Sequence, residues 1–398
     1  MKLGPRNWNN GDLSRSRHPA RRFELEHQVL VNHAPDQVFA WCRWVPGAMP
    51  DEASGLIPYH PSSANAEGIT WNDTALSEAL FAQTARTDHH TVRWITTLLD
   101  PQSWRLHALF TVADLLIGML AVEMTPVQAQ ADKTRITIRL TCTALCQRGN
   151  RIMGQKAEEG SARWLQQLGD AIRQFADQPL PGGTSPDVIP ARNCRQEHVS
   201  HTVEVNEKDL VFSREAAFAM ACPVAELDWI EDWSFDLVYS ASGRNEEHCI
   251  FKEALSAPLV QCRRGHTIWY TTRFVPSTGH FDAVLLTGSD LRALFRFAIS
   301  ELAEGRWRLR WDLTCLGIDD RGNSIIAQPG FRKRMAQMLQ FLERSALHYL
   351  RSGTMYRVPL KQKAGLVFSR VHAALTRHIP GLLARKRPAP HGKLIQAD

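Results

Sequence analysis

The sequence predicts an α+β protein built from two copies of one β-rich domain, each closed by a long helix. Residues 306–323 (RWRLRWDLTCLGIDDRGN) alternate apolar and polar side chains, which is typical of a half-buried antiparallel strand. Residues 135–150 (RITIRLTCTALCQRGN) show the same alternation and share a Leu-Thr-Cys and an Arg-Gly-Asn at matching offsets. Amphipathic patterns at 156–178 and 331–351 then predict one closing helix after each strand.

Two further pairs of short motifs relate the halves of the chain. Trp94-Ile95-Thr96-Thr97 matches Trp269-Tyr270-Thr271-Thr272, and Ala113-Asp114-Leu115 matches Ser289-Asp290-Leu291. All the matches recur in the same order at a shift of roughly 173–176 residues. That distance suits duplicated domains rather than a solenoid repeat, because it is the length of one ordinary domain.

Changes in composition divide the chain into five predicted segments. Residues 1–21 are polar and basic, which is typical of a flexible leader. The stretch PLPGGTSP at 179–186 interrupts every periodic pattern and indicates a linker. The expected segments are the leader (1–21), a first domain (22–178), the linker (179–197), a second domain (198–353) and a tail (354–398).

Two apolar runs, at 106–124 and 281–300, are interpreted as pairs of strands and not as membrane spans. Asp114 lies in the middle of the first run, where a lone carboxylate would be costly in hydrocarbon, and the second run contains Asp290 and two arginines. We expect each run to turn near its Asp. Further turns are predicted at Asp100-Pro101, Asp132-Lys133 and Gly322-Asn323.

The composition is ordinary for a globular protein, with 44% hydrophobic and 22% charged residues. A net charge of +6 over 398 residues gives no case for a nucleic-acid partner. The eight Cys include no CxxC pair, so we expect neither a zinc site nor disulfides, but reduced thiols in a cytoplasmic protein. The N-terminus lacks the apolar core of a signal peptide.

The order of elements in each half resembles the START/Bet v 1-like (SRPBCC) superfamily, which includes polyketide cyclases and lipid-transfer domains. The second copy resembles it more closely, through Cys222-Pro223-Val224, Trp229, Trp233 and the run YSASG at 239–243. The resemblance covers roughly 22–178 and 198–353. It implies two helix-grip domains, in which a curved antiparallel sheet wraps the long C-terminal helix and leaves a cavity for an apolar or amphipathic ligand.

Within such a cavity, four tryptophans of the second copy are candidate ligand contacts. We select Trp229, Trp233, Trp269 and Trp311 from their expected places in the fold. The alternative is that they belong to solid core, as Trp on a curved sheet often does.

An acidic cluster surrounds two of these tryptophans. We interpret it as a solvated loop whose tryptophans cap the core, and a metal site or an acid/base pair is the alternative. A calcium loop is disfavoured because no Gly lies within the run, so we expect no metal and no cofactor. The cluster comprises Glu226, Asp228, Glu231, Asp232 and Asp236.

Other polar residues are predicted to be structural. Cys142 and Cys315 occupy equivalent inward positions and are expected to pack as small apolar groups. Arg139, Arg310 and Asp312 fall on the outward face by alternation, so they do not match the polar cavity residues of polyketide cyclases.

The tail differs from the rest of the chain because it combines an apolar stripe with many basic residues. A basic amphipathic helix can lie on an anionic membrane surface, and docking on this protein or on a partner is the equal alternative. The residues expected at that contact are Leu366, Val367, Arg370, Val371 and Arg377.

The leading functional hypothesis is therefore a non-catalytic binder or carrier of a hydrophobic small molecule or lipid, cytoplasmic or peripheral at the membrane. No Ser-His-Asp, HExxH, P-loop or GxGxxG context appears, which favours a protein that is not an enzyme. The alternative is an aromatase/cyclase-like enzyme acting on a polyketide or related intermediate, which predicts polar side chains inside at least one cavity. In a third interpretation, only the second copy functions and the first is its structural partner.

Overall fold

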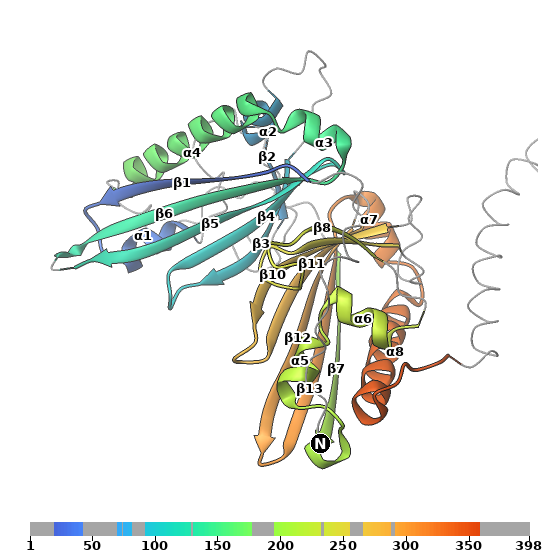
Figure 1. Ribbon diagram of the computed structural model, residues 1–398. Coiled ribbons are helices and arrows are strands. Elements are labelled where there is room, and N and C mark those ends of the chain that lie inside the picture. The colour runs from blue at the N-terminus through green and yellow to red at the C-terminus, as the bar shows by residue number, and fades with distance from the viewer. Residues whose placement is uncertain are drawn as a thin grey trace, which may run out of the picture.

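The computed structural model describes residues 20–42, 70–73, 75–81, 92–128, 130–176, 195–231, 235–254, 266–287 and 291–358. Within them the chain forms two antiparallel sheets, each packed against a long C-terminal helix (Figure 1). The fold is the tandem α+β helix-grip arrangement that the sequence predicts. Residues 179–194 of the predicted linker and the tail contacts at 366–377 lie outside the described residues, and the first strand of the second domain already begins at Gln196.

The first domain contains a six-stranded sheet in the order β1-β6-β5-β4-β3-β2. Its helix α4 (Gln155–Ala176) closes the domain and packs over β1. The strands are β1 (Arg22–Val31), β2 (Thr70–Asp73), β3 (Val92–Asp100), β4 (Arg105–Val112), β5 (Leu116–Val127) and β6 (Gln130–Ala144). The shorter helices are α1 (Pro35–Cys42), α2 (Ala75–Phe81) and α3 (Gln147–Ile152).

The second domain contains a seven-stranded sheet in the order β7-β13-β12-β11-β10-β9-β8. Helix α8 (Phe331–Ser352) closes it and packs along β7. The strands are β7 (Gln196–Asn206), β8 (Phe235–Tyr239), β9 (Ile250–Ala254), β10 (His266–Val275), β11 (His280–Thr287), β12 (Leu291–Ala303) and β13 (Arg306–Gly317). The shorter helices are η2 (Glu207–Asp209), α5 (Arg214–Ala219), α6 (Pro223–Trp229) and α7 (Asp320–Ile326).

The duplication is visible in the strand register. Cys142 of β6 lies opposite Phe23, and Cys315 of β13 lies opposite Glu197, so both strands pair with the first strand of their own domain. Trp94 of β3 pairs with Phe110 of β4 in the first domain. Its counterpart in the repeat is Trp269, which occupies the matching place on β10 in the second domain.

Two of the predicted turns are wrong. Asp132 and Lys133 lie inside β6, between Gln130 and Thr134, which pair with Val127 and Pro126 of β5 across a register shift. Gly322 and Asn323 lie inside helix α7, whose first turn is capped by the Asp319 side chain accepting a hydrogen bond from the Gly322 N–H. The turns at Pro101 and around Asp114 are confirmed.

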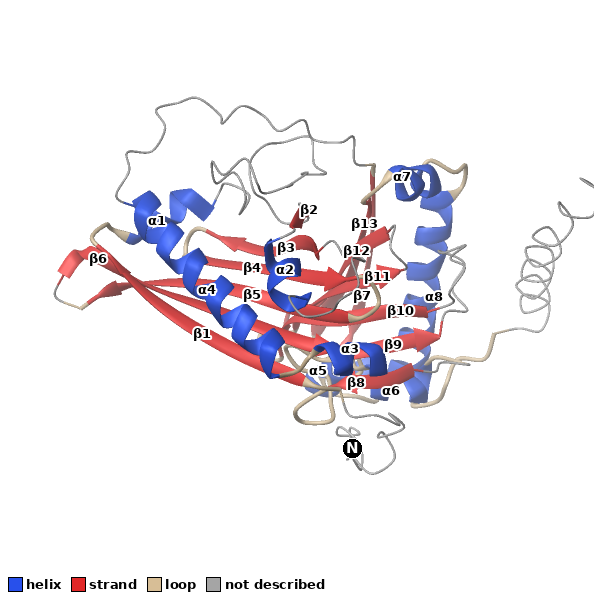
Figure 2. Cartoon of the chain, turned by 90° about the horizontal axis from the view of Figure 1, so that it is seen from above, coloured by secondary structure: helices blue, strands red, loops and turns tan. Residues whose placement is uncertain are grey.

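Both faces of each sheet are partly buried, which the sequence analysis did not predict. One face packs on the closing helix of its own domain, while part of the other face packs on the sheet of the other domain (Figures 1 and 2). We call this second contact the inter-sheet core. Its buried residues are Ile95, Leu109, Ile117, Met119 and Leu145 from the first domain with Ile250, Ile268, Tyr270, Val284, Leu286 and Leu316 from the second.

Polar contacts surround the inter-sheet core. The buried Arg292 guanidinium donates to Thr111 Oγ1 over 3.0 Å, and Lys252 Nζ donates to the Leu145 carbonyl. The Arg22 guanidinium lies 4.2 Å from the centre of the Tyr239 ring. Because each contact joins one domain to the other, the two sheets form a single packed unit at this point.

None of the helices in the described part of the chain combines the length and the apolar character needed to cross a bilayer. The apolar runs at 106–124 and 281–300 are the strand pairs β4–β5 and β11–β12, as predicted.

Candidate functional site

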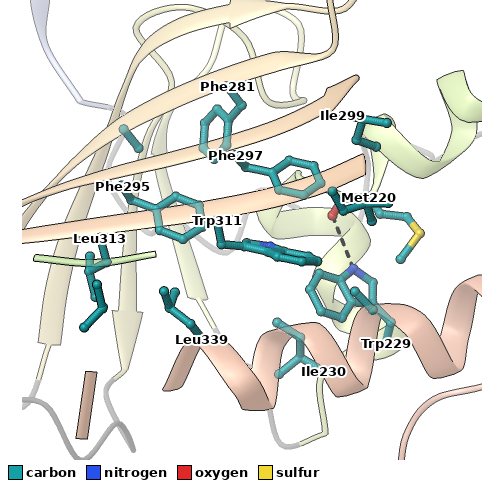
Figure 3. Packing of buried hydrophobic residues seen from close by; sticks show 14 of the residues in the cluster. Met220, Trp229, Ile230, Phe281, Phe295, Phe297, Ile299, Trp311, Leu313 and Leu339 are labelled. Carbon is teal, nitrogen blue, oxygen red and sulfur yellow. Dashed lines mark hydrogen bonds between the residues drawn. The ribbon is translucent and has the colours of Figure 1, made fainter. Parts of the chain in front are cut away.

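The grip face of the second domain is lined by aromatic side chains that lie between the sheet and α8. Trp311 of β13 packs against Phe297 with ring centres 5.3 Å apart. Trp229, at the end of α6, donates its indole N–H to the Met220 carbonyl over 3.2 Å (Figure 3). Trp311 and Trp229 are only 3% and 5% exposed, so both pack as core, and a contact between either ring and a ligand stays a prediction.

Trp269 differs from these two residues because it is half-buried and its indole N–H bonds to a carboxylate. Its ring stacks on Phe251 at 5.5 Å and meets Phe295 edge to face at 5.5 Å. Its indole N–H donates to Glu253 Oε2 over 2.7 Å. The three rings and the carboxylate therefore lie on the same face of neighbouring strands. Trp233, the fourth predicted tryptophan, lies outside the described residues.

Glu253 faces a second carboxylate, Glu226 of α6. Desolvation by burial raises the pKa of Glu253 to about 7, against a smaller lowering by the Trp269 hydrogen bond. The pKa of Glu226 is raised well above its ordinary value, first by burial and then by the negative charge of Glu253. Both side chains are half-buried and keep some accessible surface, so neither is sealed in solid core.

The chemical consequence is a pair of carboxyl groups whose protonated forms are both favoured by burial. Burial and the negative charge of Glu253 favour the protonated form of Glu226, and a pKa of about 7 allows Glu253 to exchange its proton near neutrality. Pairs of titratable groups whose environments separate their pKa values are the usual arrangement of an acid and a base. No Lys or Arg is among the causes of either shift, so no positive charge offsets the pair within the described residues.

Helix α6 brings Glu226 to this place. Pro223 stands in its first turn, which suits helix entry. Asp228, two residues beyond Glu226, accepts a hydrogen bond of 3.4 Å from the Tyr349 hydroxyl of α8. The interpretation of the acidic cluster as a solvated loop is therefore wrong for Glu226, which is helical and desolvated.

In the first domain, packed side chains occupy the position that corresponds to Trp269 and its neighbouring carboxylates. Trp94, the counterpart of Trp269, stacks on Trp164 of α4 with ring centres 6.2 Å apart and is 3% exposed. Helix α2 also packs closely on α4, since a Cβ on Gly160 would lie 2.2 Å from the Ala79 carbonyl oxygen. In the first domain, the closing helix α4 therefore contacts the sheet directly at the position where the second domain has Glu226 and Glu253.

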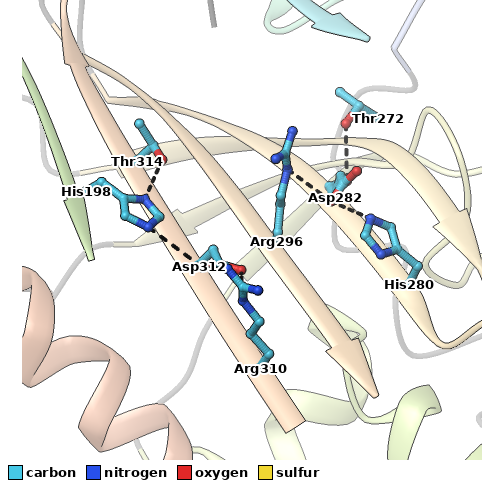
Figure 4. A network of polar contacts seen from close by, with 8 residues as sticks. All are labelled: His198, Thr272, His280, Asp282, Arg296, Arg310, Asp312 and Thr314. Carbon is cyan, nitrogen blue, oxygen red and sulfur yellow. Dashed lines mark hydrogen bonds and ion pairs between the residues drawn. The ribbon is translucent and has the colours of Figure 1, made fainter. Parts of the chain in front are cut away.

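The outward residues named from the sequence form a separate polar network on the other face of the second sheet (Figure 4). Arg310 Nε lies 2.7 Å from Asp312 Oδ2, and His280 Nε2 lies 3.0 Å from Asp282 Oδ1. In the first domain Arg139 bridges Glu26 and Glu123 in the same way. The prediction that Arg139, Arg310 and Asp312 point away from the grip is confirmed.

The cysteines also occupy the positions predicted for them. Cys142 and Cys315 are buried in the cores under the two closing helices. Burial raises the pKa of each thiol to about 12, which leaves it protonated and unsuited to nucleophilic attack.

Glu253 is the functional candidate that the sequence analysis missed. It lies in a short strand, β9, whose five residues (IFKEA) contain two adjacent charges and carry no recognisable motif. Its place on the grip face follows from pairing with β10, where it stands opposite Thr267. Only the pairing of β9 with β10 in the folded chain places Glu253 beside Glu226 and Trp269.

No protein-family model and no curated protein matches the chain. Among solved structures, the chain is similar to "the di-domain ARO/CYC BexL from the BE-7585A biosynthetic pathway", with 15% identity, a TM-score of 0.29, and coverage of 84% of this chain and 100% of that one. It is likewise similar to "the di-domain ARO/CYC StfQ from the steffimycin biosynthetic pathway", with 12% identity, a TM-score of 0.31, and coverage of 86% and 99%.

A single-domain match is a "START superfamily protein from Mycobacterium smegmatis", with 17% identity, a TM-score of 0.30, and coverage of 39% of this chain and 99% of that one. Because these TM-scores and identities are low, the fold described here rests on the strand order and the closing helices. Function rests on the site itself.

Proposed function

We propose that the second domain binds a small molecule with several carbonyl groups and promotes its cyclisation by proton transfer, as an aromatase/cyclase-like enzyme acting on a polyketide or related intermediate. The observation that supports this proposal is the Glu226–Glu253 pair on the grip face. Polar groups inside the grip are what the enzyme hypothesis predicts, whereas a simple apolar carrier does not require them.

The two carboxyl groups have complementary roles in the proposed reaction. Ionised Glu253 takes a proton from the carbon next to a ligand carbonyl, and the resulting enolate attacks a second carbonyl carbon of the same molecule. The oxygen of that second carbonyl takes the proton of Glu226 and becomes a hydroxyl. When the hydroxyl leaves, it takes the proton held by Glu253 and departs as water, and the enolate-derived carbon loses its remaining proton to Glu226.

Trp269 contributes in two ways. Its N–H bond to Oε2 orients the Glu253 carboxylate, and its ring face, continuous with Phe251, supplies a stacking surface for a flat ligand. The acidic pair disfavours a ligand with a negative charge at this position, because no described cation compensates it.

The experiment that tests this proposal is turnover of a short poly-β-ketone thioester, followed by the absorbance of the aromatic product. Replacing Glu253→Gln or Glu226→Gln should each lower the rate by about 10²–10⁴-fold, the usual contribution of a general acid or base. The exposed Glu304→Gln is the matched control and should leave the rate unchanged. No rate above buffer for the parent protein would contradict the enzymatic proposal.

A second candidate function, carriage of a hydrophobic small molecule, is favoured by the aromatic lining of Phe251, Trp269 and Phe295. Native mass spectrometry of the purified protein distinguishes the two functions. A carrier retains an apolar compound of defined mass, and its affinity is unaffected by Glu226→Gln. Carriage of a lipid and attachment to a membrane through the tail stay predictions.

A further inference from the structure

Asn245 is a buried polar residue between β8 and β9 that takes no direct part in the proposed reaction. It is 5% exposed. Its Nδ2 donates to the Ala221 carbonyl over 2.8 Å, and its Oδ1 accepts from Thr271 Oγ1 over 2.7 Å. Its backbone N–H points at Cys222 Sγ, 3.4 Å away. The side chain thus uses both ends of its amide.

The contacts of Asn245 connect two parts of the fold that carry the carboxylate pair. Ala221 and Cys222 directly precede α6, the helix of Glu226, and Cys222 is its N-cap residue. Thr271 belongs to β10, which pairs with β9, the strand of Glu253. Backbone bonds between Thr271 and both His248 and Cys249 extend that ladder up to the Asn245 loop.

The beginning of helix α6 also packs against β8, since Cys222 and Ala225 are buried beside Phe235. The helix is seven residues long, and its N-cap residue makes no side-chain capping bond. Its other side-chain bonds come from its end: Trp229 reaches Met220, and Asp228 meets Tyr349 of α8. Those bonds hold α6 to α5 and α8, whereas the bonds of Asn245 hold it to the sheet.

We infer that Asn245 is a positioning residue, which sets the approach of Glu226 to Glu253 by fastening the start of α6 to β10. This inference rests on the proposed function for the role of the carboxylate pair. Glu226 and Glu253 keep their raised pKa values only while both side chains stay desolvated. Loss of the bonds from Asn245 to the start of α6 would let Glu226 move away from Glu253. Water would then reach both groups.

The test is an infrared titration of the carboxylic acid carbonyl stretch, which needs neither substrate nor turnover. Glu253→Gln identifies the band that belongs to Glu253. In the parent protein that band should disappear with a midpoint near pH 7. Asn245→Ala should move the midpoint down by roughly one pH unit, because a better solvated carboxyl group ionises at lower pH.

Thr271→Val is the milder variant, because it removes only the hydroxyl that donates to Asn245 Oδ1 and keeps the volume of the side chain. It should shift the midpoint in the same direction by a smaller amount. Arg244→Ala, at the exposed neighbouring position, is the matched control and should titrate as the parent protein does. Circular dichroism establishes that each variant is folded.

A midpoint unchanged in both folded Asn245→Ala and Thr271→Val would overturn the inference, even if the carboxylate pair acts as proposed. A titration in which Glu253→Gln removes no band would instead overturn the proposed function, and with it the site that Asn245 is inferred to serve. The two failures are therefore distinguishable in one set of spectra.

Discussion

Replacement of Glu253 by Gln should make the protein more stable at alkaline pH. In the folded state the pKa of Glu253 is about 7, against 4.5 for an unperturbed Glu side chain. A carboxyl group with a raised pKa contributes its stability below the unfolded value and loses that contribution as the pH rises through the folded value. The relevant window is therefore pH 4.5 to 7.

The magnitude follows from the size of the shift. Each pKa unit corresponds to 1.36 kcal/mol, so a shift of this size is worth about 3 kcal/mol for a fully buried group. Since Glu253 keeps some accessible surface, solvent screening reduces the expected effect to roughly 2 kcal/mol. Gln cannot ionise and still offers an oxygen to the Trp269 N–H, so Glu253→Gln should be more stable by that amount at pH 8 and nearly neutral at pH 4.5.

Urea unfolding followed by tryptophan fluorescence at pH 4.5 and pH 8 measures the difference. Glu304→Gln, at an exposed position, is the control and should change the free energy of unfolding by less than about 0.5 kcal/mol at either pH. The reasoning is refuted if Glu253→Gln gains nothing at pH 8, or if the gain is the same at both pH values.

Three further predictions concern the surroundings of the site. Leu286→Ala should cost about 2–4 kcal/mol in urea unfolding, because the side chain is buried between the two sheets, and a cost below 1 kcal/mol would show a loose interface. Burial lowers the pKa of His107 to about 4, so its neutral form contributes stability that is lost as the pH falls from 6.5 toward 4. His107→Gln should remove up to about 3 kcal/mol of that loss of stability, and a free energy of unfolding with the same dependence on acid pH as the parent protein would refute this. Tyr349→Phe should cost about 1 kcal/mol, because the hydroxyl donates to Asp228; equal stability of the two proteins would show that this bond contributes nothing.

Periodicity predicted the elements of the fold that bury one face. The alternation at 306–323 became β13 (Arg306–Gly317), with Trp311 and Cys315 turned toward the closing helix. The stripe at 331–351 became α8 (Phe331–Ser352). In both cases one face of the element is buried and the other is polar, and a local periodic pattern records that difference between the two faces.

Burial on two faces was harder to predict. Strands β5 and β11 contain continuous apolar runs, LIGMLAV and AVLL, which are typical of strands covered on both sides. The sequence does not state what covers the second face. That depends on the inter-sheet core, which joins residues more than a hundred positions apart, such as Leu109 and Val284.

The candidate site was predicted only in part. Trp269 was selected from its place in the repeat, but its partner Glu253 was not, because the two meet through sheet register and not through a motif. Glu226 was noticed as one member of a charge cluster, and charge clusters are usually solvated. Its desolvation becomes visible only when α6 is placed against the grip face.

Exchange of carbon-bound protons tests the central claim most directly, because it isolates the first proposed step from any later chemistry. Proton NMR in D₂O would follow deuteration of the methyl group of 2-acetonaphthone, a flat aromatic ketone, in the presence of the full chain. The parent protein and Glu304→Gln should accelerate exchange by roughly 100-fold over buffer, and Glu253→Gln should remove that acceleration. Exchange at the buffer rate with the parent protein, or equal acceleration by Glu253→Gln, would contradict a base at Glu253.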